Sequence, residues 1–412
     1  MERNTKSALP SRAWKHLKSI QDADILVGIP SYNNAHTINY VVYQTAKGLE
    51  TFFPNRKSVI LVSDGNSTDG TLQALEAMRL PFRVSVVPST YVGVPGKGSA
   101  VKAIFEAGSF LEVKAVALVD SDLRSITPEW IQLLVSPALS GTGFVAPFYL
   151  RHKYDGTITN FLCYPVTSSL FGKRIRQPIG GDFGLSIELV RTLLESPLWR
   201  TSYVPRFGID IFETHTALAG EFEVKQAFLG TKIHEAKDPA VHLAPMFRQV
   251  VGSMFTSIDY YQNVWRRIRS NLAVEIIGDK KYAGVPEEIQ IDLQGLVETY
   301  EDGFDENKQV YRKILSSDLF AEVRRSMKTT HTEVSFSPET WAKIVFLFAA
   351  SFRKEKGSIR ERLLDALRIL WIGKVAAFVN ETLELDAARA ERRVEEEAKV
   401  FEELKPFMLD IF

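Results

Sequence analysis

The sequence predicts an α/β fold, with a Rossmann-like, mostly parallel sheet in the N-terminal part and a helical C-terminal domain. Two observations favour this class. Between residue 24 and about residue 148, short apolar runs alternate with segments whose apolar residues recur at helical spacing. After about Ser270, helical patterns dominate. Such an alternation is typical of a parallel sheet whose strands are joined by right-handed helical crossovers.

The alternating part contains four expected strands in order. They lie at "ADILVGIP", "KSVILVSDG", "FRVSVVP" and "VKAVALVDSD", and the helices between them at "NAHTINYVVYQTAKGLETFF", "TDGTLQALEAM" and "GKGSAVKAIFEAGSFL". In sheets of this kind, ligands bind just beyond the carboxyl ends of the strands. The polar turns that follow the four strands are therefore expected to converge on one crevice; they are "PSYNN", "SDGNSTDG", "PSTYVGVPGKG" and "DSDLRS".

These patterns divide the chain into an N-terminal extension (1–23), an α/β domain (24–265) and a helical domain (266–412). Residues 149–265 are mixed in pattern and contain the glycine-rich segment "QPIGGDFG". Several later helical patterns begin with a proline or an acidic cap. Because the late helices are amphipathic and carry no cluster of catalytic residues, the tail is expected to assemble a homo-oligomer or to close the site.

Composition excludes several classes of protein. Of the 412 residues, 50 are basic and 50 acidic, so no nucleic-acid partner is expected. The single cysteine, Cys163, allows no intramolecular disulfide and suits a reducing compartment. The N-terminus has no apolar signal core. The apolar stretch "ALRILWIGKVAAFV" is interrupted by Arg368 and Lys374, so no membrane span is expected and a cytoplasmic location is predicted.

Two carboxylates one residue apart end the fourth expected strand. Asp120 and Asp122 flank Ser121 and follow the apolar run 116–119. Like charges this close are costly unless a positive group lies beside them. One interpretation is an acidic strand end without further role. The other is a site for a hard divalent cation such as Mg²⁺, which takes one or two carboxylates together with substrate phosphate oxygens.

A histidine would be a suitable further ligand for Mn²⁺. His234, in "GTKIHEAKD", ends an apolar run and is the first candidate. His215 and His242 are its competitors, and each of the three is alternatively a structural or surface residue.

The turn "SDGNSTDGT" allows two interpretations. Asp64 ends a strand and would accept hydrogen bonds from a base or a ribose in a nucleotide site. Alternatively, Thr68 and Asp69 make the segment a loop with strong helix capping.

The segment "VPGKGSA" places two glycines around Lys97 just before a helix. Such a loop can bring backbone N–H groups and a helix N-terminus to a phosphate, with Lys97 as the counter-charge. Together with the acid pair, it predicts a site for a diphosphate and a metal ion.

The order of the motifs resembles a known family. "GIPSYNN", "SDGNSTDGT", "PGKG", "VDSD…TPEWI", "QPIGGDFG", "FGIDI" and "KIH" follow one another as in GT-A glycosyltransferases that make glucosyl- or mannosylglycerate, namely mannosylglycerate synthases and glucosyl-3-phosphoglycerate synthases. The resemblance covers residues 24 to about 250, and family members also carry a helical C-terminal region. "SDGNSTDGT" is shared with the wider family-2 transferases, whereas the ordered set is specific.

The resemblance implies a role for each matching residue. The implied donor site consists of Pro30, Tyr32, Asn34, Ser63, Asp64, Lys97, Asp120, Ser121, Gly180 and Gly181. The implied metal site for Mg²⁺ or Mn²⁺ consists of Asp122, His234 and Asp120, the last also beside the ribose or a metal-bound water. The implied catalytic residues are Lys97 at the diphosphate, Asp182 at the donor sugar and Asp210 at sugar or acceptor hydroxyls.

The resemblance also implies the reaction. A divalent cation would offset the charge that builds on the leaving diphosphate of a UDP-, GDP- or ADP-hexose. Relatives retain the anomeric configuration and lack an obvious enzymic nucleophile, so front-face attack by the acceptor hydroxyl is expected. Relatives usually have Glu where this chain has Asp182, which leaves the choice between a glucosyl and a mannosyl donor open.

The acceptor is expected to be D-glycerate. In relatives that use 3-phosphoglycerate, a basic residue near a G-x-x-T segment grips the phosphate, and this chain has Thr157 there, in "DGTIT". Thr159 is expected to contact a carboxylate or a hydroxyl of the acceptor. Bidentate arginine is the usual phosphate ligand, so an acceptor site without that charge favours plain glycerate, which has no phosphate group. Basic residues that could replace it are Arg151, Lys153, Lys173 and Arg174.

Three alternatives stay open. The first is a glucosyl-3-phosphoglycerate synthase, and the second a family-2 transferase with a polyol or lipid-phosphate acceptor. The third is a sugar-nucleotide-binding scaffold without activity, whose helical tail binds a partner.

Overall fold

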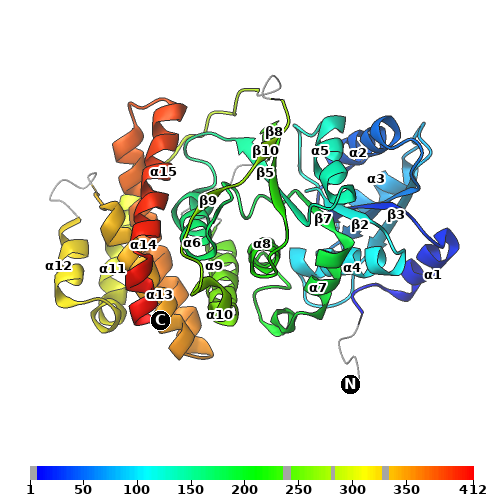
Figure 1. The fold of residues 1–412 in the computed structure, drawn as a ribbon. Coiled ribbons are helices and arrows are strands. Elements are labelled where there is room, and N and C mark those ends of the chain that lie inside the picture. Colours follow the sequence, from blue (N-terminus) through cyan, green and yellow to red (C-terminus); the bar gives the residue numbers. More distant parts are fainter. Residues whose placement is uncertain (1–6, 235–242, 280–283, 327–333) are drawn as a thin grey trace. The chain divides into compact units, whose positions relative to one another are not determined.

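The computed structural model describes residues 7–234, 243–279, 284–326 and 334–412 (Figure 1). The chain forms two compact units, each made of several segments. The sheet unit comprises Met1–Leu150, Gln177–Glu235 and Val274–Pro286. The helical unit comprises Arg151–Arg176, Ala236–Ala273 and Glu287–Phe412.

The sheet unit is built on an eight-stranded sheet in the order β10-β8-β5-β7-β4-β1-β2-β3. Strand β7 is antiparallel to both β4 and β5, and the other pairs are parallel. The predicted α/β class with a mostly parallel sheet is therefore confirmed. The strands are β1 (Ile25–Ser31), β2 (Ser58–Asp64), β3 (Ser85–Thr90), β4 (Ala115–Leu118), β5 (Phe144–Leu150), β7 (Phe183–Ser186), β8 (Val224–Thr231) and β10 (Ile276–Ile277).

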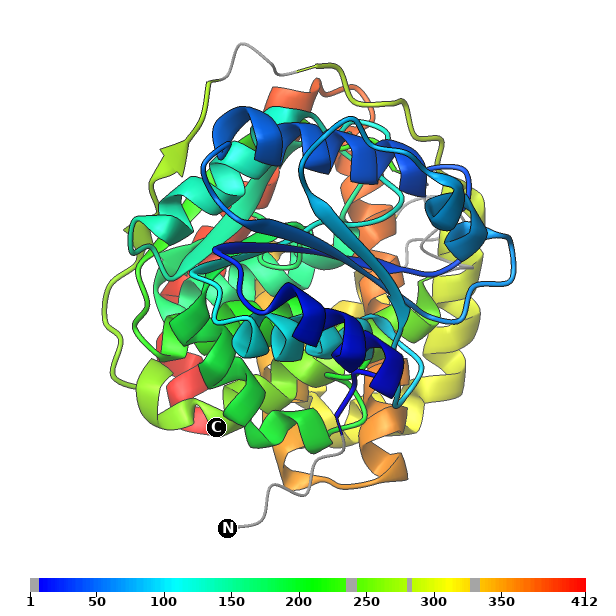
Figure 2. The ribbon, with the colours of Figure 1, turned by 90° about the vertical axis from the view of Figure 1, so that its right-hand side faces the viewer.

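Helices cover both faces of this sheet (Figure 2). One face carries α2 and α5, and the opposite face carries α4. Gly28 of β1 allows the approach of α4, because a Cβ there would lie 2.3 Å from Ile104. The helices of this unit are α1 (Ser11–Ile20), α2 (Ile38–Phe52), α3 (Thr71–Ala77), α4 (Lys97–Phe110), α5 (Pro128–Leu139), α7 (Ile187–Glu195) and α8 (Ile209–Ala219), with a 3₁₀ turn at Pro197–Arg200.

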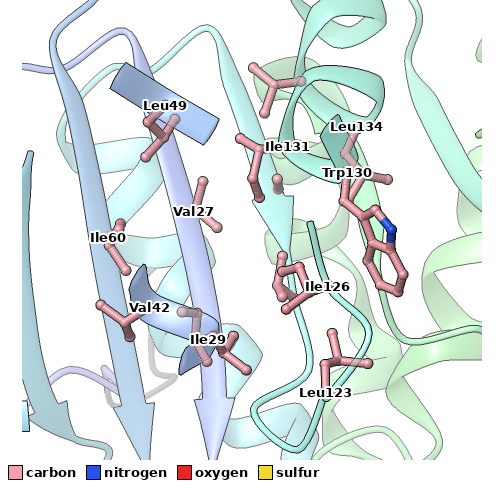
Figure 3. Packing of buried hydrophobic residues seen from close by; sticks show 14 of the residues in the cluster. Val27, Ile29, Val42, Leu49, Ile60, Leu123, Ile126, Trp130, Ile131 and Leu134 are labelled. Carbon is pink, nitrogen blue, oxygen red and sulfur yellow. The ribbon is translucent and has the colours of Figure 1, made fainter. Parts of the chain in front are cut away.

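The core beneath α2 and α5 follows from strand alternation (Figure 3). Val27 and Ile29 of β1 and Ile60 of β2 point to one face, since alternate residues of a strand share a face. They pack with Leu49 of α2 and Ile131 of α5, all of them buried. Burying each such side chain contributes roughly 1.5–3 kcal/mol, which fixes the strand register and so the positions of the strand ends.

The helical unit contains a π-helix at Thr159–Cys163, followed by α6 (Tyr164–Phe171). Its short strands β6 (Lys173–Arg174) and β9 (Leu272–Ala273) pair in parallel. Its other helices are α9 (Ala244–Tyr260), α10 (Gln262–Trp265), α11 (Leu293–Ile314), α12 (Ser317–Ser326), α13 (Pro338–Lys354), α14 (Ser358–Thr382), α15 (Ala387–Glu403) and α16 (Lys405–Ile411). Within the described ranges, no helix is long and apolar enough to cross a membrane.

Acids of α15 bind the segment that contains the π-helix and α6. The Arg176 guanidinium donates to Glu391 at 2.6 and 2.9 Å, and the Arg174 guanidinium donates to Glu402 at 2.9 and 2.7 Å. The Tyr164 hydroxyl donates to Glu395 at 2.8 Å. This explains why residues 151–176 belong to the helical unit although they lie inside the expected α/β domain.

The expected domain boundaries therefore differ from the two units. The extension 1–23 belongs to the sheet unit, where the Ala8 N–H donates to Glu106 of α4 at 2.9 Å. Residues 274–286 also belong to the sheet unit, since β10 pairs with β8. Hydrophobic periodicity and composition describe local structure and cannot show that distant segments pack together. Each expected domain was therefore one continuous stretch of the sequence.

Candidate functional site

The turns after β1, β2 and β4 lie together at the carboxyl edge of the sheet. The Ser121 hydroxyl, after β4, donates to the Asn34 side-chain oxygen, after β1, at 2.7 Å. The Asn33 N–H donates to the Ser67 hydroxyl, after β2, at 2.7 Å. The expected convergence of these three turns is confirmed.

Asp64 lies inside its own loop. The side chain is buried, and its oxygens accept from the Ser67 N–H at 2.8 Å and the Ser67 hydroxyl at 2.6 Å. Asp69 accepts from the Ala35 and Thr71 N–H groups at 2.9 and 3.1 Å. The N-cap of α3 is Gly70, without a side-chain cap hydrogen bond, so Thr68 and Asp69 stabilise the loop but do not occupy the expected N-cap position. The contact of Asp64 with a base or ribose stays a prediction.

The turn after β1 offers an exposed aromatic ring. Tyr32 is 63% exposed, and its ring lies beside Gly65, where a Cβ would come within 3.0 Å of the ring. Pro30 lies within β1, and Ser63, within β2, is buried. The face of Tyr32 is therefore the part of the predicted nucleoside site that is open to solvent.

A cluster of charged side chains lies at the carboxyl ends of β4 and β8. The Lys97 ammonium lies 2.8 Å from Asp120 Oδ1 and 3.1 Å from Asp210 Oδ1. The Lys232 ammonium lies 2.8 Å from Asp120 Oδ2 and 2.9 Å from Asp182 Oδ2. Burial alone would raise the pKa of Asp120, but Lys232 and Lys97 hold that pKa below its ordinary value.

The cluster has an exposed layer and a buried layer. In the exposed layer, the side chains of Lys97 and Asp210 are each 13% exposed and that of Asp120 is 21% exposed. In the buried layer, Lys232 is 4% exposed and Asp182 is fully buried. The exposed layer can meet a ligand, whereas the buried layer lies behind it.

Asp182 is held in the buried layer by three neighbours. Its Oδ1 accepts from the Asp120 N–H at 2.8 Å, and its Oδ2 accepts from the Tyr149 hydroxyl and from Lys232. Gly181 beside it has φ +89°, and a Cβ there would lie 2.3 Å from Asp120 Oδ2, so only glycine fits. The predicted contact of Asp182 with the donor sugar would require this buried network to open.

The glycines around Lys97 have a different use from the expected one. The Gly98 N–H donates to the Arg206 carbonyl at 3.0 Å, and the Ser99 N–H donates to the Pro205 carbonyl at 2.9 Å. A Cβ on Gly98 would lie 1.9 Å from the Val204 carbonyl oxygen. The segment of residues 205–206 therefore binds these N–H groups, and the Lys97 ammonium is the group of this loop that is still predicted to meet a diphosphate.

Asp120 has lysine partners that were not expected from the sequence, and its part in a metal site stays a prediction. Each Asp120 oxygen faces a lysine, so an ammonium group already compensates this carboxylate. Among the residues with described positions, no group of three or more His, Cys, Asp or Glu side chains is placed to hold a metal ion. The predicted triplet of Asp122, His234 and Asp120 is thus not assembled there.

Asp122 and His234 nevertheless lie on adjoining segments. The Arg124 N–H donates to the Ile233 carbonyl at 3.0 Å, and the Ile233 N–H donates to the Ser125 hydroxyl at 2.9 Å. Both Asp122 and His234 are partly exposed. A carboxylate and an imidazole on neighbouring strand-end loops suit a cation that takes its remaining ligands from a substrate diphosphate. The competitor His242 lies outside the described residues.

Helix α8 carries a second acid, Glu213, close to Asp210 of the cluster. Asp210 and Glu213 are one helical turn apart, and both Glu213 oxygens are buried without a hydrogen-bond partner among the described residues. Burial, and then the negative charge of Asp210, raises the pKa of Glu213 well above its ordinary value. Burial lowers the pKa of His215 to about 3, so that this competitor for the metal is a neutral core residue.

Replacing Glu213 with glutamine tests whether the pKa of Glu213 is raised in the folded protein. Because the pKa of Glu213 is raised in the folded protein, this residue stabilises the fold fully at pH values below its pKa in the unfolded chain, which is near the ordinary 4.5. That stabilisation is lost as the pH rises towards the raised pKa of the folded protein. Glutamine does not ionise, so the difference in unfolding free energy, Glu213→Gln minus wild type, should grow as pH rises above the ordinary pKa of 4.5, by up to about 1.4 kcal/mol per pH unit, and should level off above the raised pKa of Glu213. Urea unfolding at several pH values measures it, with the exposed Glu129→Gln as control. A difference that is constant with pH would show that Glu213 is ionised throughout.

The predicted acceptor residues lie in the helical unit. Thr157 and Thr159 are buried, and the Thr157 carbonyl accepts from the Trp371 indole N–H at 3.4 Å. The Lys153 ammonium donates to the Thr382, Leu383 and Leu385 carbonyls at the end of α14, at 2.7, 3.1 and 2.9 Å. This basic residue therefore serves as a helix C-cap.

Sequence reasoning missed Lys232, Tyr149 and Glu213. Lys232 follows β8 directly and precedes His234 by two residues, but it lies 112 residues from Asp120, so no local pattern linked the two. Tyr149 gave no signal, because an aromatic residue in a strand is ordinary.

Comparison with known proteins gives a match of one segment to a family model. Residues 26–181 match the model described as glycosyl transferase family 2. No curated protein matches the sequence. Among solved structures, the chain is similar to glucosyl-3-phosphoglycerate synthase from Mycobacterium tuberculosis in complex with phosphoglyceric acid, with 24% identity, a TM-score of 0.44, and 60% of this chain and 85% of that chain covered.

A second structure of that enzyme, in complex with Mg²⁺ and uridine diphosphate, gives 25% identity and a TM-score of 0.45 over 59% of this chain and 82% of that chain. TM-scores at this level are too low for these structures to define the site of this chain. The family match agrees with the α/β fold and with the carboxyl-edge site. The match of residues 26–181 to the glycosyl transferase family 2 model supports assignment of the protein as a glycosyltransferase.

Proposed function

We propose that the protein transfers a glucosyl or mannosyl group from a nucleoside-diphosphate hexose to D-glycerate, with Mg²⁺ or Mn²⁺ as cofactor. The observation that carries the proposal is the exposed layer of Lys97, Asp120 and Asp210, next to the adjoining segments of Asp122 and His234. A nucleotide-sugar site requires a positive group for the diphosphate, an acid that binds sugar hydroxyls and ligands for a metal ion. At the carboxyl edge, Lys97 can supply the first, Asp120 or Asp210 the second, and Asp122 with His234 the third.

Each exposed residue has a part in this proposal. Tyr32 would stack on the base, and Lys97 would offset charge on the diphosphate. Burial alone would lower the pKa of Lys97, but Asp120 and Asp210 raise that pKa above its ordinary value, so the lysine stays charged. Asp210 would accept hydrogen bonds from sugar or acceptor hydroxyls.

Asp122 and His234 would hold the divalent cation. The bound cation would supply Lewis-acid stabilisation of the leaving diphosphate. Asp182 is buried and bound by Asp120, Tyr149 and Lys232, so it is not available as a nucleophile in this arrangement. This supports direct attack by the acceptor hydroxyl, the route that retention without an enzymic nucleophile requires.

The described contacts favour glycerate over 3-phosphoglycerate as acceptor. Of the four basic residues that could replace the missing arginine, Lys153 caps α14 and Arg174 pairs with Glu402. Arg151 lies 3.6 Å from Asp155. A phosphate would have to displace these partners before it gained its own charge-assisted bonds. Lys173 is partly buried in β6 and is the remaining candidate.

The acceptor assignment is tested by Thr157→Arg. The wild-type enzyme is expected to have the higher kcat/KM with D-glycerate, and the variant should move the ratio towards 3-phosphoglycerate by about ten- to a hundredfold, as one charge-assisted hydrogen bond is worth roughly 1.5–3 kcal/mol. Initial rates with both acceptors measure the ratio, and Thr157→Gln controls for added bulk. A wild-type preference for 3-phosphoglycerate of more than about tenfold would refute the glycerate assignment and make Lys173 the first residue to mutate.

A further inference from the structure

Lys232 is fully used as a hydrogen-bond donor inside the site. Its ammonium donates to Asp120 Oδ2 at 2.8 Å, to the Gly180 carbonyl at 2.8 Å and to Asp182 Oδ2 at 2.9 Å. An ammonium group has three N–H donors, so each has one of these partners. The chain places a saturated lysine behind the exposed layer, where no ligand needs to touch it.

The three acceptors come from two different loops. Asp120 follows β4, whereas Gly180 and Asp182 belong to the segment before β7. These loops already approach closely, because a Cβ on Gly181 would lie 2.3 Å from Asp120 and one on Gly180 would lie 2.2 Å from Pro147. Lys232 therefore joins the acid of the β4 loop to the "QPIGGD" segment at the point where they meet.

The charge of Lys232 also links the two loops. Asp120 and Asp182 are both acids, and the Asp120 N–H is bound to Asp182 at 2.8 Å, so the two carboxylates lie close together. Removing one partner of a buried ion pair leaves a buried charge uncompensated, and the surrounding groups must then move or take up water. Lys97 contacts Oδ1 of Asp120, whereas Lys232 contacts both Asp120 and Asp182.

We propose that Lys232 is a positioning residue of the transfer reaction. It holds the Asp120 carboxylate and the Gly180–Asp182 segment in one arrangement, so that the groups facing the diphosphate and those facing the hexose stay in register. The inference rests on the proposed function and adds to it a residue that acts through Asp120 and Asp182, not on the substrate itself.

The test compares Lys232→Met, which keeps an unbranched side chain only one atom shorter and removes the charge, with Lys232→Arg. Because small misplacement of reacting groups costs about a hundredfold in rate, Lys232→Met is expected to lower kcat about 100-fold. The donor KM and the Kd of the nucleoside diphosphate alone, measured by calorimetry, should change less than about fivefold. Lys232→Arg should recover at least tenfold of the lost kcat. Lys225→Met is the matched control and should keep wild-type kinetics, because Lys225 lies in β8, the strand that leads to Lys232, and pairs with the surface acids Glu223 and Glu275.

A double variant keeps the test decisive if Lys232→Met does not fold. In Lys232→Met with Asp182→Asn, both charges of the pair are removed together, so no buried charge is left unpaired. If Lys232 acts through Asp182, the kcat of the double variant should be no lower than the kcat of the more impaired single variant. If Lys232→Met is insoluble, Asp182→Asn alone is the reference. Additive losses, a kcat of Lys232→Met within threefold of wild type, or a parallel loss of nucleotide affinity would overturn the inference. Absence of turnover in the wild-type enzyme with every hexose donor would instead refute the proposed function. The role of Lys232 is tested by the ratio of the kcat of each variant to that of the wild type.

Discussion

Replacing Asp122 with alanine is expected to lower the rate of hexosyl transfer at least about 100-fold. Asp122 is the carboxylate of the DSD motif that no described lysine compensates, and its loop adjoins the segment of His234. Loss of a metal ligand removes stabilisation of the leaving diphosphate worth several kcal/mol, and each 1.4 kcal/mol is a factor of ten in rate. Initial rates over a titration of Mg²⁺ and Mn²⁺ measure the effect.

The matched control is Glu129→Ala, which removes an exposed carboxylate from the first turn of α5. It should leave the rate within about twofold of wild type, because surface substitutions of this kind change little. Excess metal should restore part of the activity of Asp122→Ala if His234 still binds. Full activity of Asp122→Ala, or of wild-type enzyme after exhaustive chelation, would rule out the metal assignment.

Ending the chain after residue 286 is expected to give insoluble protein. This truncation removes α11–α16, which supply Trp341, Trp371 and Tyr311 to the core of the helical unit. It leaves Arg174 and Arg176 without their α15 carboxylates. Each large core side chain lost costs about 3–5 kcal/mol, so the remaining helical segments cannot stay folded at a total stability of about 5–15 kcal/mol.

The soluble fraction, the thermal unfolding curve and the mass in solution test this expectation, with the full chain purified in the same way as control. The mass of the full chain also tests the prediction of a homo-oligomer. A soluble truncate that unfolds cooperatively and keeps the wild-type kinetics would show that the helical region is needed neither for folding nor for the site.

Local sequence patterns predicted the first half of the sheet and not the second. Strands β1 to β4 follow one another with helices between them, so their periodicity was visible. Strand β7 has only four residues, and it lies between β4 and β5 in the sheet although it follows both in sequence. Its place depends on pairing with β4 and β5, which no local pattern records.

The same limit applies to the site. Lys97, Asp120, Asp182 and Asp210 were predicted and are joined in one cluster. The partners of these residues were not predictable, since Lys232 lies 112 residues from Asp120 and Lys97 lies 113 from Asp210. The lysine partners of Asp120 were not expected, because the number of nearby lysines depends on the fold, whereas the acid pair is visible in the sequence.

The most direct test of the proposed function is turnover of UDP-, GDP- and ADP-hexoses labelled in the sugar, with D-glycerate, 3-phosphoglycerate and glycerol as acceptors, with Mg²⁺ or Mn²⁺ and after chelation. We expect a labelled glucosyl- or mannosylglycerate to form with one nucleotide donor, in the presence of metal only, and at a higher kcat/KM with glycerate than with either other acceptor. Absence of product with every donor–acceptor pair, or equal turnover without metal, would contradict the proposed function.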